Sequence, residues 1–343
     1  MRKILLFITI TLSLTIGYFA VDANAITSTS STTTSSNSTV TGSGQALEIG
    51  PPTIIMSGNP GQILTTSINL RDISSSKLIV TGQVNDFEAS SQEDGTPKII
   101  LDDTIESSYS LKKWISPFST LTLNPKQLKT FPVTIKIPAN ASPGGYYGVV
   151  RFTSKAPDLN DTGVALSASL GSLLMIRVNG DAKENVTTEE FYVSSDNKKS
   201  TIFESTPIQL TERFKNNGNV DEAPTGQISI SDMFGKKIAN VNINLDGYKI
   251  LPNSIRKYSQ VLDYKTIGTK KLFGRYTAEM KVTYGSKKEV ITSKITFWVV
   301  PYRMIGMAIV ALIGAFIALR FLIKRYNKHI TSKYEKSKSK AKK

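Results

Sequence analysis

Residues 275–284 read RYTAEMKVTY, and apolar and polar side chains alternate along this whole segment. Its even-numbered residues are aromatic or aliphatic, and its odd-numbered residues are charged residues or threonine. Because successive side chains of a β-strand point to opposite faces of a sheet, this period of two predicts a strand with one buried face. Gly285-Ser286 then provides a turn, and the similar segment Val290–Val299 follows it. The two segments are expected to form an antiparallel hairpin.

Segments of the same kind recur upstream and are separated by clusters of Pro, Gly and Asn, such as Asn59-Pro60-Gly61. The further predicted strands are Ile63–Leu70, Lys77–Val84, Phe131–Ile137, Tyr146–Phe152, Ser169–Val178, Pro207–Phe214 and Gly226–Asp232. The cluster Asn216-Asn-Gly-Asn219 is expected to turn the chain with positive backbone φ. Strands at such intervals predict an all-β protein with two tandem β-sandwiches, one in residues 46–181 and one in residues 182–303. Each unit is long enough to bury its own core.

The carboxyl-terminal region predicts a membrane anchor. Residues 304–319 carry no charge, and the apolar run continues past Arg320 to Ile323. A helix needs about 20 apolar residues to cross the hydrocarbon core of a bilayer, so residues 304–323 are expected to form one transmembrane helix. Residues 324–343 contain nine Lys or Arg and one Glu. Such basic segments stay on the cytoplasmic side and lie against anionic lipid, so the tail is expected inside and the sandwiches outside.

The amino terminus is consistent with this orientation. Arg2 and Lys3 precede an apolar stretch, and Ala23-Asn-Ala25 is a small-x-small cleavage site. Residues 1–25 are therefore expected to be a secretory signal peptide, with an uncleaved signal anchor as the alternative. Residues 26–45 are rich in Ser and Thr without an apolar period, which predicts a disordered stalk. The expected product is a single-pass protein of the cell membrane with its amino terminus extracellular and its carboxyl terminus cytoplasmic.

Two neighbouring segments of the first unit carry a family resemblance. They read LTLNPKQLKTFPVTIKIP at residues 121–138 and PGGYYGVVRF at residues 143–152, and the Pro60-Gly61 turn precedes an earlier strand. This pattern resembles the first, peptidoglycan-binding domain of the WxL protein-interacting family of Gram-positive bacterial surface proteins. The terminal helix and the Lys-rich tail match the layout of that family.

The second unit is similar to bacterial immunoglobulin-like domains. The similarity rests on the Asn216–Asn219 turn, the strand-turn-strand segment Gly226–Ile238 and the pair Gly274 and Tyr276. The unit corresponds in position to the second domain of the WxL protein-interacting family, which is implicated in host binding. The resemblance covers most of residues 47–343 and implies two immunoglobulin-like sandwiches that contact cell wall and partner proteins. Its motifs are turn and core signals, so no binding residue is carried over.

The residue types argue against the common catalytic sites. The sequence has no cysteine, and its one histidine, His329, lies in the basic tail. This excludes Ser-His-Asp and Cys-His triads and the usual zinc sites from the outer region. Paired carboxylates remain, but adjacent ones such as Asp102 and Asp103 point to opposite faces of a strand and do not flank a cleft. We therefore expect no enzyme activity, no catalytic residue, no cofactor and no metal. The net charge of +15 lies mainly in the tail, so no nucleic-acid partner is expected.

The segment Phe87–Pro117 is the longest irregular stretch and carries Tyr109 and Trp114. Long insertions on a rigid sandwich are frequent binding regions, and aromatic rings suit both sugars and proteins. The alternative for Trp114 is that it plugs one end of the first core. Tyr146 and Tyr147 are adjacent in one strand, so at most one of them is expected in the core. These four aromatic residues are the candidate binding residues.

Pro301 ends the last predicted strand three residues before the membrane helix. The second sandwich is therefore expected close to the bilayer, with Trp298 and Tyr302 near the lipid headgroups. The alternative for Trp298 is packing inside the sandwich. Ala311-x-x-x-Ala315 and Gly314-x-x-x-Ala318 would permit close helix pairing, which leaves homo-oligomerisation open.

The function expected from these features is that of a membrane-anchored cell-surface binding or scaffold protein. Its expected partners are peptidoglycan, other surface or host proteins, and membrane lipid through residues 304–323 and the basic tail. An accessory subunit of an export or envelope-assembly membrane complex is the alternative. A wall hydrolase that uses carboxylates is a third hypothesis. The sequence does not identify the ligand or state whether the stalk is glycosylated.

Overall fold

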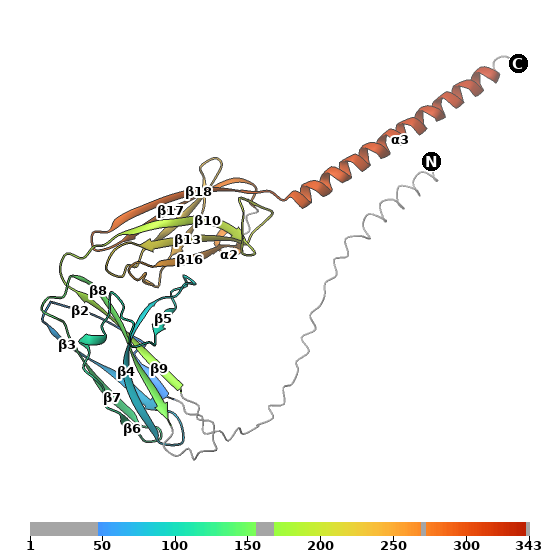
Figure 1. The fold of residues 1–343 in the computed structure, drawn as a ribbon. Coiled ribbons are helices and arrows are strands. Elements are labelled where there is room, and N and C mark those ends of the chain that lie inside the picture. The colour runs from blue at the N-terminus through green and yellow to red at the C-terminus, as the bar shows by residue number, and fades with distance from the viewer. Residues whose placement is uncertain (1–46, 156–167, 269–271, 341–343) are drawn as a thin grey trace. The chain divides into compact units, whose positions relative to one another are not determined.

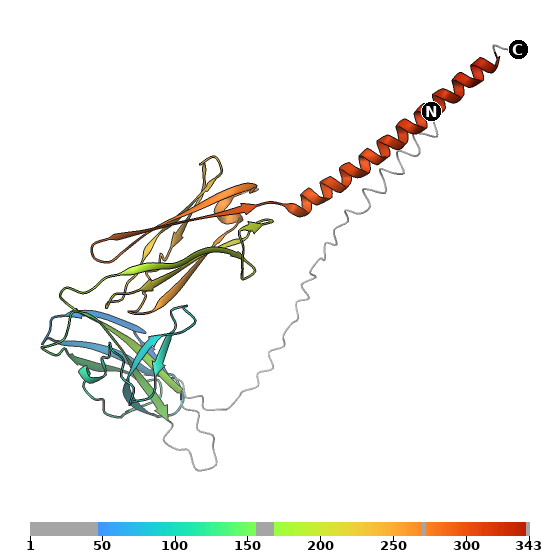
Figure 2. The ribbon, with the colours of Figure 1, turned by 45° about the horizontal axis from the view of Figure 1, so that its top comes forward.

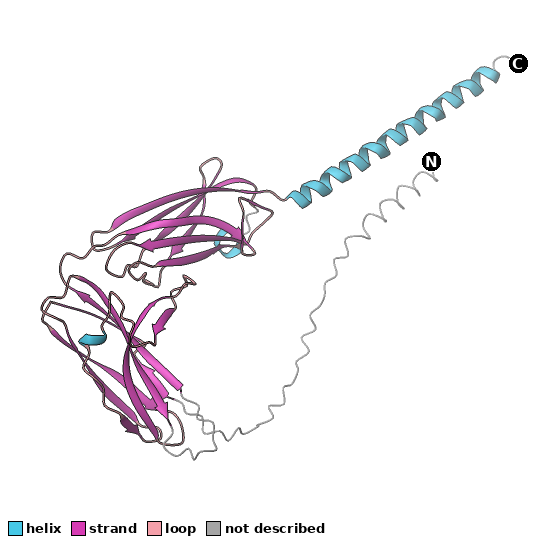
Figure 3. Ribbon diagram, in the orientation of Figure 1, coloured by secondary structure: helices cyan, strands magenta, loops and turns pink. Residues whose placement is uncertain are grey.

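The computed structural model describes residues 47–155, 168–268 and 272–340 (Figure 1). The predicted all-β class is confirmed, because strands make up most of these residues and one apolar helix follows them (Figure 3). The predicted signal peptide and Ser/Thr-rich stalk lie outside the described residues. Each strand predicted from the sequence overlaps an observed strand. Both sandwiches belong to the same compact unit of the chain.

The described part of the first sandwich contains nine strands and one 3₁₀ turn. They are β1 (Leu47–Gly50), β2 (Thr53–Gly58), β3 (Ile63–Asp72), β4 (Leu78–Ala89), β5 (Pro97–Ile100), η2 (Lys112–Trp114), β6 (Leu121–Leu123), β7 (Leu128–Lys136), β8 (Gly144–Lys155) and β9 (Ala168–Val178). One sheet has the order β1-β3-β7, and the other has the order β2-β9-β8-β4-β5 with β6 beside β4. Their facing side chains, such as Ile68 and Phe152, are fully buried and form the core.

The chain changes sheets between β1 and β2. β1 pairs with β3, whereas β2 runs parallel to β9 in the opposite sheet, with Ile54 opposite Leu174. Pro51 and Pro52 separate the two strands. Because proline has no backbone N–H to donate, a proline pair interrupts the ladder at this point.

The second sandwich follows after a short connection. Its elements are β10 (Val186–Ser195), β11 (Lys198–Lys199), β12 (Ile202–Phe203), β13 (Ile208–Asn216), β14 (Thr225–Asp232), β15 (Lys237–Ile243), β16 (Ile255–Leu262), α2 (Tyr264–Ile267), β17 (Gly274–Tyr284) and β18 (Glu289–Val299). The sheets have the orders β11-β10-β13-β16 and β12-β18-β17-β14-β15. Figure 2 separates these layers, with the orange strands β17 and β18 in one and the yellow-green strands β10 and β13 in the other.

The alternation in residues 275–284 corresponds to one buried and one outward face of β17, as predicted. All even-numbered residues of β17 from Tyr276 to Tyr284 are buried, and its partner β18 buries Phe297 and Val299 on the same side. Trp298 lies between these two core residues and points outward, with 46% of its surface exposed. The alternative that Trp298 packs inside the sandwich is therefore wrong.

The turn at residues 216–219 forms by a mechanism other than the predicted one. None of its residues has positive φ, so that expectation was wrong. Instead, the buried Asn216 side chain donates from Nδ2 to the carbonyls of Val220 (2.7 Å) and Ile250 (2.9 Å), and its Oδ1 accepts from the Gly218 N–H (2.9 Å). Glycine is needed at 218 because a Cβ there would lie 2.3 Å from the Lys183 carbonyl oxygen.

The last element is α3 (Tyr302–Lys340). Its part from Tyr302 to Ser332 is long and apolar enough to cross a membrane, and it is the one such helix among the described residues. Its large apolar side chains are exposed, as expected for a surface that faces lipid. The helix begins two residues before the predicted span and continues into the basic segment, for which the sequence pattern predicts no secondary structure.

Candidate functional site

The predicted irregular segment Phe87–Pro117 is only partly irregular. Residues Phe87–Ala89 complete β4, and Pro97–Ile100 pairs back on it as β5, with Asp86 opposite Ile100. The tip of this hairpin contains two residues with positive φ, Glu93 (60°) and Gly95 (84°). The segment therefore forms a hairpin followed by a loop.

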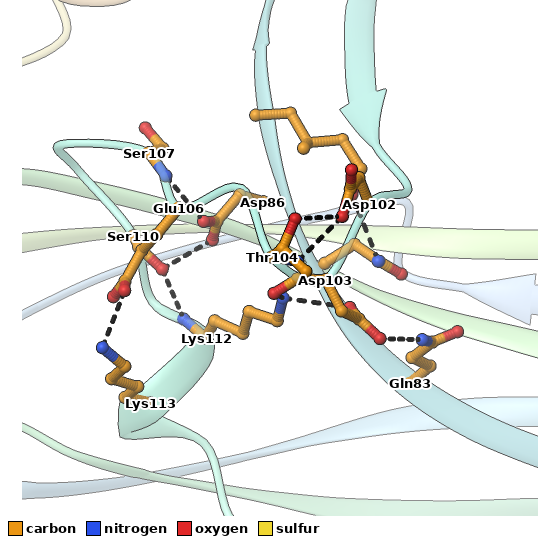
Figure 4. A network of polar contacts seen from close by, with 12 residues as sticks. Gln83, Asp86, Asp102, Asp103, Thr104, Glu106, Ser107, Ser110, Lys112 and Lys113 are labelled. Carbon is orange, nitrogen blue, oxygen red and sulfur yellow. Dashed lines mark hydrogen bonds and ion pairs between the residues drawn. The ribbon is translucent and has the colours of Figure 1, made fainter.

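Asp86 anchors the loop that follows the hairpin (Figure 4). Its carboxylate is buried, accepting from the Ser107 N–H at 3.0 Å and from the Ser110 hydroxyl at 2.7 Å. Ser110 Oγ also accepts from the Lys112 N–H (3.1 Å), which starts the 3₁₀ turn that carries Trp114. A buried carboxylate without such donors would cost several kcal/mol, so these bonds fix the loop on the sheet.

The outer charges of this loop are paired with one another (Figure 4). Asp103 forms an ion pair with Lys112 (2.9 Å) and accepts from Gln83 (3.2 Å). Asp102 accepts from the N–H and the hydroxyl of Thr104, and these bonds lower the pKa of Asp102. The two adjacent carboxylates thus have separate structural partners. Among the described residues, no group of three or more His, Asp or Glu side chains is arranged to hold a metal ion.

The four predicted aromatic residues form two pairs on opposite faces of β8. Trp114 lies on Tyr146, with 4.2 Å between ring centroids, and both rings are partly exposed and pack against the main core. Tyr109 meets Tyr147 edge to face at 6.2 Å, and Phe87 meets the same Tyr147 ring at 6.1 Å. Tyr147 is buried and Tyr146 is not, as expected of adjacent residues in one strand.

The hydroxyl of Tyr147 joins the aromatic cluster to the second sandwich. It donates to Asp221 Oδ1 (3.0 Å), and Asp221 Oδ2 pairs with Lys249 Nζ (2.5 Å). Burial, followed by the nearby Asp221 carboxylate, raises the pKa of Tyr147. In parallel, Asn253 Nδ2 donates to the hydroxyl of Tyr109 at 3.1 Å. The two predicted tyrosines are therefore also junction residues.

The tip of the β4–β5 hairpin makes a second polar connection. Both carboxylate oxygens of Glu93 accept from Arg213 of β13, at 2.6 and 2.7 Å, and the Glu93 carbonyl accepts from the Lys257 N–H at 2.7 Å. The bidentate guanidinium lowers the pKa of Glu93 and raises that of Arg213. Such fork-to-fork pairs have a defined orientation, so this contact fixes direction as well as distance.

A cavity of about 240 Å³ lies between these connections. Its apolar walls include Ile55, Phe87 and Met175 of the first sandwich and Leu251 of the second. Arg256 forms a cationic wall, lying 4.9 Å from the centre of the Tyr248 ring and donating to the Lys249 carbonyl (2.8 Å). Apolar walls with a few fixed polar groups are typical of ligand sites, and this volume, below the roughly 300 Å³ at which small-molecule pockets begin, suits a single side chain or a ligand fragment.

Sequence reasoning missed the residues of the second sandwich that line this region. Arg213 occurs at a polar, outward position of a predicted strand, but its partner Glu93 is 120 residues away in the chain. A period-two pattern gives the face of a side chain and does not give its distant partner. No signal within this single sequence identifies Asp221, Lys249 or Arg256 as neighbours of the aromatic cluster.

No protein-family model matches the chain, and no curated protein sequence matches it either. Solved structures with similar folds include the class 5 fimbriae chaperone CfaA, with 14% identity, a TM-score of 0.36, and coverage of 75% of this chain and 100% of that chain. The E. coli chaperone DraB has 12% identity and a TM-score of 0.34, covering 74% and 98%. A chain from the complex of Salmonella enterica SafA pilin with the SafB chaperone has 10% identity and a TM-score of 0.32, covering 74% and 97%. At these identities and scores, no ligand, partner or function is assigned from the likeness.

Proposed function

We propose that this chain is a membrane-anchored binding and scaffold protein of the cell surface. In this proposal, helix α3 anchors the chain, the two sandwiches stand outside the cell, and they hold peptidoglycan and other surface or host proteins. The basic tail remains in the cytoplasm, as the distribution of Lys and Arg favours. The resemblance to the WxL protein-interacting family of Gram-positive bacteria supports the same role.

The observation that carries the proposal is the direct passage from sandwich to helix. β18 ends at Val299 and α3 begins at Tyr302, so two residues separate a folded β domain from an apolar helix of membrane-spanning length. A helix with exposed apolar side chains along its length requires an apolar solvent. This supports a role for the two sandwiches at the membrane surface.

The binding role is supported by two separate features, the partly exposed Trp114–Tyr146 pair on one face of β8 and the cavity, whose lining residues Phe87 and Met175 pack with Tyr147 on the other face. The rings of Trp and Tyr present flat apolar faces with polar edges, which suit the alternating apolar and hydroxyl surfaces of sugars. The cavity adds apolar walls and the guanidinium of Arg256. The described residues place these groups on a rigid support, because the Asp86 network and the Glu93–Arg213 pair fix the surrounding loops.

The test is retention of the full-length protein, in detergent micelles, on purified peptidoglycan sacculi. We expect sedimentation with the sacculi and its reduction by Trp114→Ala, whereas the control Tyr192→Ala in the second sandwich should leave it unchanged. Absence of retention for the unmodified protein would contradict the wall-binding proposal. Release of soluble wall fragments would require the hydrolase hypothesis instead.

The alternative role as an accessory subunit of a membrane complex makes a different prediction. Other membrane proteins would copurify with the chain only when α3 is present, and sacculi would not retain it. Replacement of α3 by an unrelated transmembrane helix separates the two cases. Wall retention should survive this replacement under the proposed function, whereas copurification should disappear under the alternative.

A further inference from the structure

Exposed apolar side chains collect at one end of the second sandwich. Phe234 is 88% exposed, Phe273 is 63% exposed and Met233 is 43% exposed. Ile202 and Trp298 are also outward-facing and lie opposite each other in the β12–β18 pairing. Single exposed apolar residues are ordinary, but a group of them on one edge of a domain marks an interaction surface.

The strand register places these residues together. Asp232, which precedes the Met233–Phe234 tip, pairs with Tyr276 of β17. Phe273 directly precedes Gly274, which pairs with Val299 at the end of β18. The Met233 side chain lies on Gly274, because a Cβ at that glycine would come within 2.1 Å of the Met233 methyl group. The tip, Phe273 and the last residues of β18 therefore occupy the same end of one sheet.

The turn between β14 and β15 is built to present its apolar residues. Asp232 Oδ1 accepts from the N–H groups of Phe234 and Lys236, both at 2.9 Å, and the Asp232 carbonyl accepts from the Gly235 N–H. Gly235 has φ of +80°, which glycine adopts at little cost. These bonds hold the backbone of the turn while the Phe234 ring remains outside the core.

Chain continuity brings this end of the sandwich close to the membrane. Val299 is the last residue of β18 and Tyr302 is the first of α3. Three residue steps span at most about 10 Å. The headgroup regions of a bilayer extend roughly 5 to 8 Å beyond each side of the hydrocarbon core. The end of β18 at Val299 is therefore within reach of the interface, and the exposed residues lie at this same end of the sheet.

The charges at this end favour anionic lipid. Lys236, Lys237 and Arg275 are exposed, and none of them forms an ion pair with another described residue. Arg303, in the first turn of α3, pairs with Glu204 at 3.2 Å. Aromatic residues with flanking Lys and Arg are typical of surfaces that lie in the headgroup layer.

We propose that the turn Asp232–Lys237, together with Phe273, forms a second membrane contact that inserts Phe234 among the headgroups of an anionic bilayer. This contact, added to the anchor, holds the second sandwich against the membrane surface. The proposal rests on the proposed function in one respect, since it requires α3 to be inserted in a bilayer.

The absence of cysteine from the sequence permits a direct test with single labels. Full-length Phe234→Cys is labelled with an environment-sensitive fluorophore and reconstituted into liposomes that contain phosphatidylglycerol and a lipid-attached quencher. Leu245→Cys is the matched control, because Leu245 is also apolar and 78% exposed. Leu245 lies two residues after Ile243, which pairs with Gly226 at the opposite end of the sheet. We expect loss of fluorescence at position 234 and none at position 245.

Flotation of the liposomes after alkaline washing separates the two proposals. Protein that does not float would overturn the membrane anchor and, with it, the proposed function. Protein that floats while the label at 234 is quenched only by a water-soluble quencher would overturn the second contact alone. Equal quenching in liposomes of phosphatidylcholine alone would overturn the contribution assigned to the lysines and Arg275.

Discussion

The two ends of the second sandwich have opposite chemistry. At the end next to the connection from the first sandwich, Glu93 and Arg213 form a bidentate pair, and Asp221 joins Tyr147 and Lys249. At the other end, Phe234 and Phe273 are exposed. β17 has 11 residues and connects these ends, so they lie roughly 33 Å apart.

This difference indicates that the two ends contact different neighbours, protein at the polar end and lipid at the apolar end. Side chains with defined hydrogen-bond partners at fixed distances belong to a protein contact, because well-aligned hydrogen bonds there offset the loss of hydration. Exposed rings with free cations beside them have no such fixed partners, and a lipid interface satisfies both without defined geometry. We therefore expect substitutions at the polar end to change stability and substitutions at the apolar end to change membrane binding.

The largest effect is expected from Asn216→Ala at the polar end. The substitution removes three hydrogen bonds and leaves the buried carbonyl groups of Val220 and Ile250 without this donor. The free energy of unfolding should fall by about 3 kcal/mol. Urea denaturation provides the measurement, with Asn240→Ala on an exposed strand position as the control. A decrease in the free energy of unfolding smaller than that of the control would contradict the role assigned to Asn216 in stabilising this end.

The pH dependence of stability should reveal Glu222, a buried carboxyl group at the polar end. One of its carboxylate oxygens is buried without a hydrogen-bond partner among the described residues, and burial, followed by repulsion from Glu184, raises its pKa to about 7. A raised pKa means that the folded state binds the proton more tightly. The contribution of Glu222 to stability is therefore full below pH 4.5 and is lost as the pH rises through 7.

We expect this loss to reach up to about 3 kcal/mol between pH 4.5 and pH 8, and Glu222→Gln should remove it. Urea midpoints of both proteins across this range measure the effect. Glu212, whose pKa is raised to about 8 by burial, acts in the same direction in both proteins and cancels from the difference. Parallel curves for the two proteins would show that Glu222 titrates normally.

A smaller effect is expected when the hairpin tip loses its ion pair. The Glu93 and Arg213 side chains are 24% and 26% exposed, so solvent screens the pair only in part. A double-mutant cycle with Glu93→Ala and Arg213→Ala should give a coupling energy of about 1 kcal/mol. The matched control is the cycle for Glu88 and Lys98, which are 50% and 65% exposed and should couple by less than about 0.5 kcal/mol. Equal coupling in both cycles would remove the distinction between junction and surface pairs.

The smallest effect on stability is expected from Phe234→Ser at the apolar end. Phe234 is 88% exposed, so the free energy of unfolding should change by less than about 0.5 kcal/mol. Leu245→Ser, at an equally open position, should change it as little. A loss of several kcal/mol for Phe234→Ser would show that the ring packs within the fold, and the contrast between the two ends would not hold.

The fold was predictable where one face of a strand is buried and the other is exposed to solvent. β17 follows this rule at every residue, and its burial pattern matches its sequence pattern. β10 escaped prediction because its register shifts between Thr188 and Glu190, and a bulge of this kind breaks the period of two. β16 carries polar residues such as Gln260 among its apolar ones, which weakens the same signal.

The candidate site was predictable only in its aromatic half. Tyr109 and Trp114 stood out as large rings in the segment Phe87–Pro117, and Tyr146 and Tyr147 as adjacent rings of one predicted strand. The described structure brings the four into two pairs. Arg213, Asp221 and Lys249 were not predictable, because the contacts that place them arise from chain segments far apart in sequence. A local sequence pattern indicates which face of a strand a residue occupies, whereas the tertiary topology determines which distant residues it contacts.

The direct passage from β18 into α3 also has a mechanical consequence. A ligand tethered to a rigid wall would pull on the first sandwich, and the force would enter the second sandwich at Val186 of β10 and leave it at Val299 of β18. β18 is held to β17 from Val299 at one end to Glu289 at the other by bonds perpendicular to the strand. Tension along the strand would load this whole ladder in shear at the same time, so the domain would resist extraction instead of unzipping one rung after another.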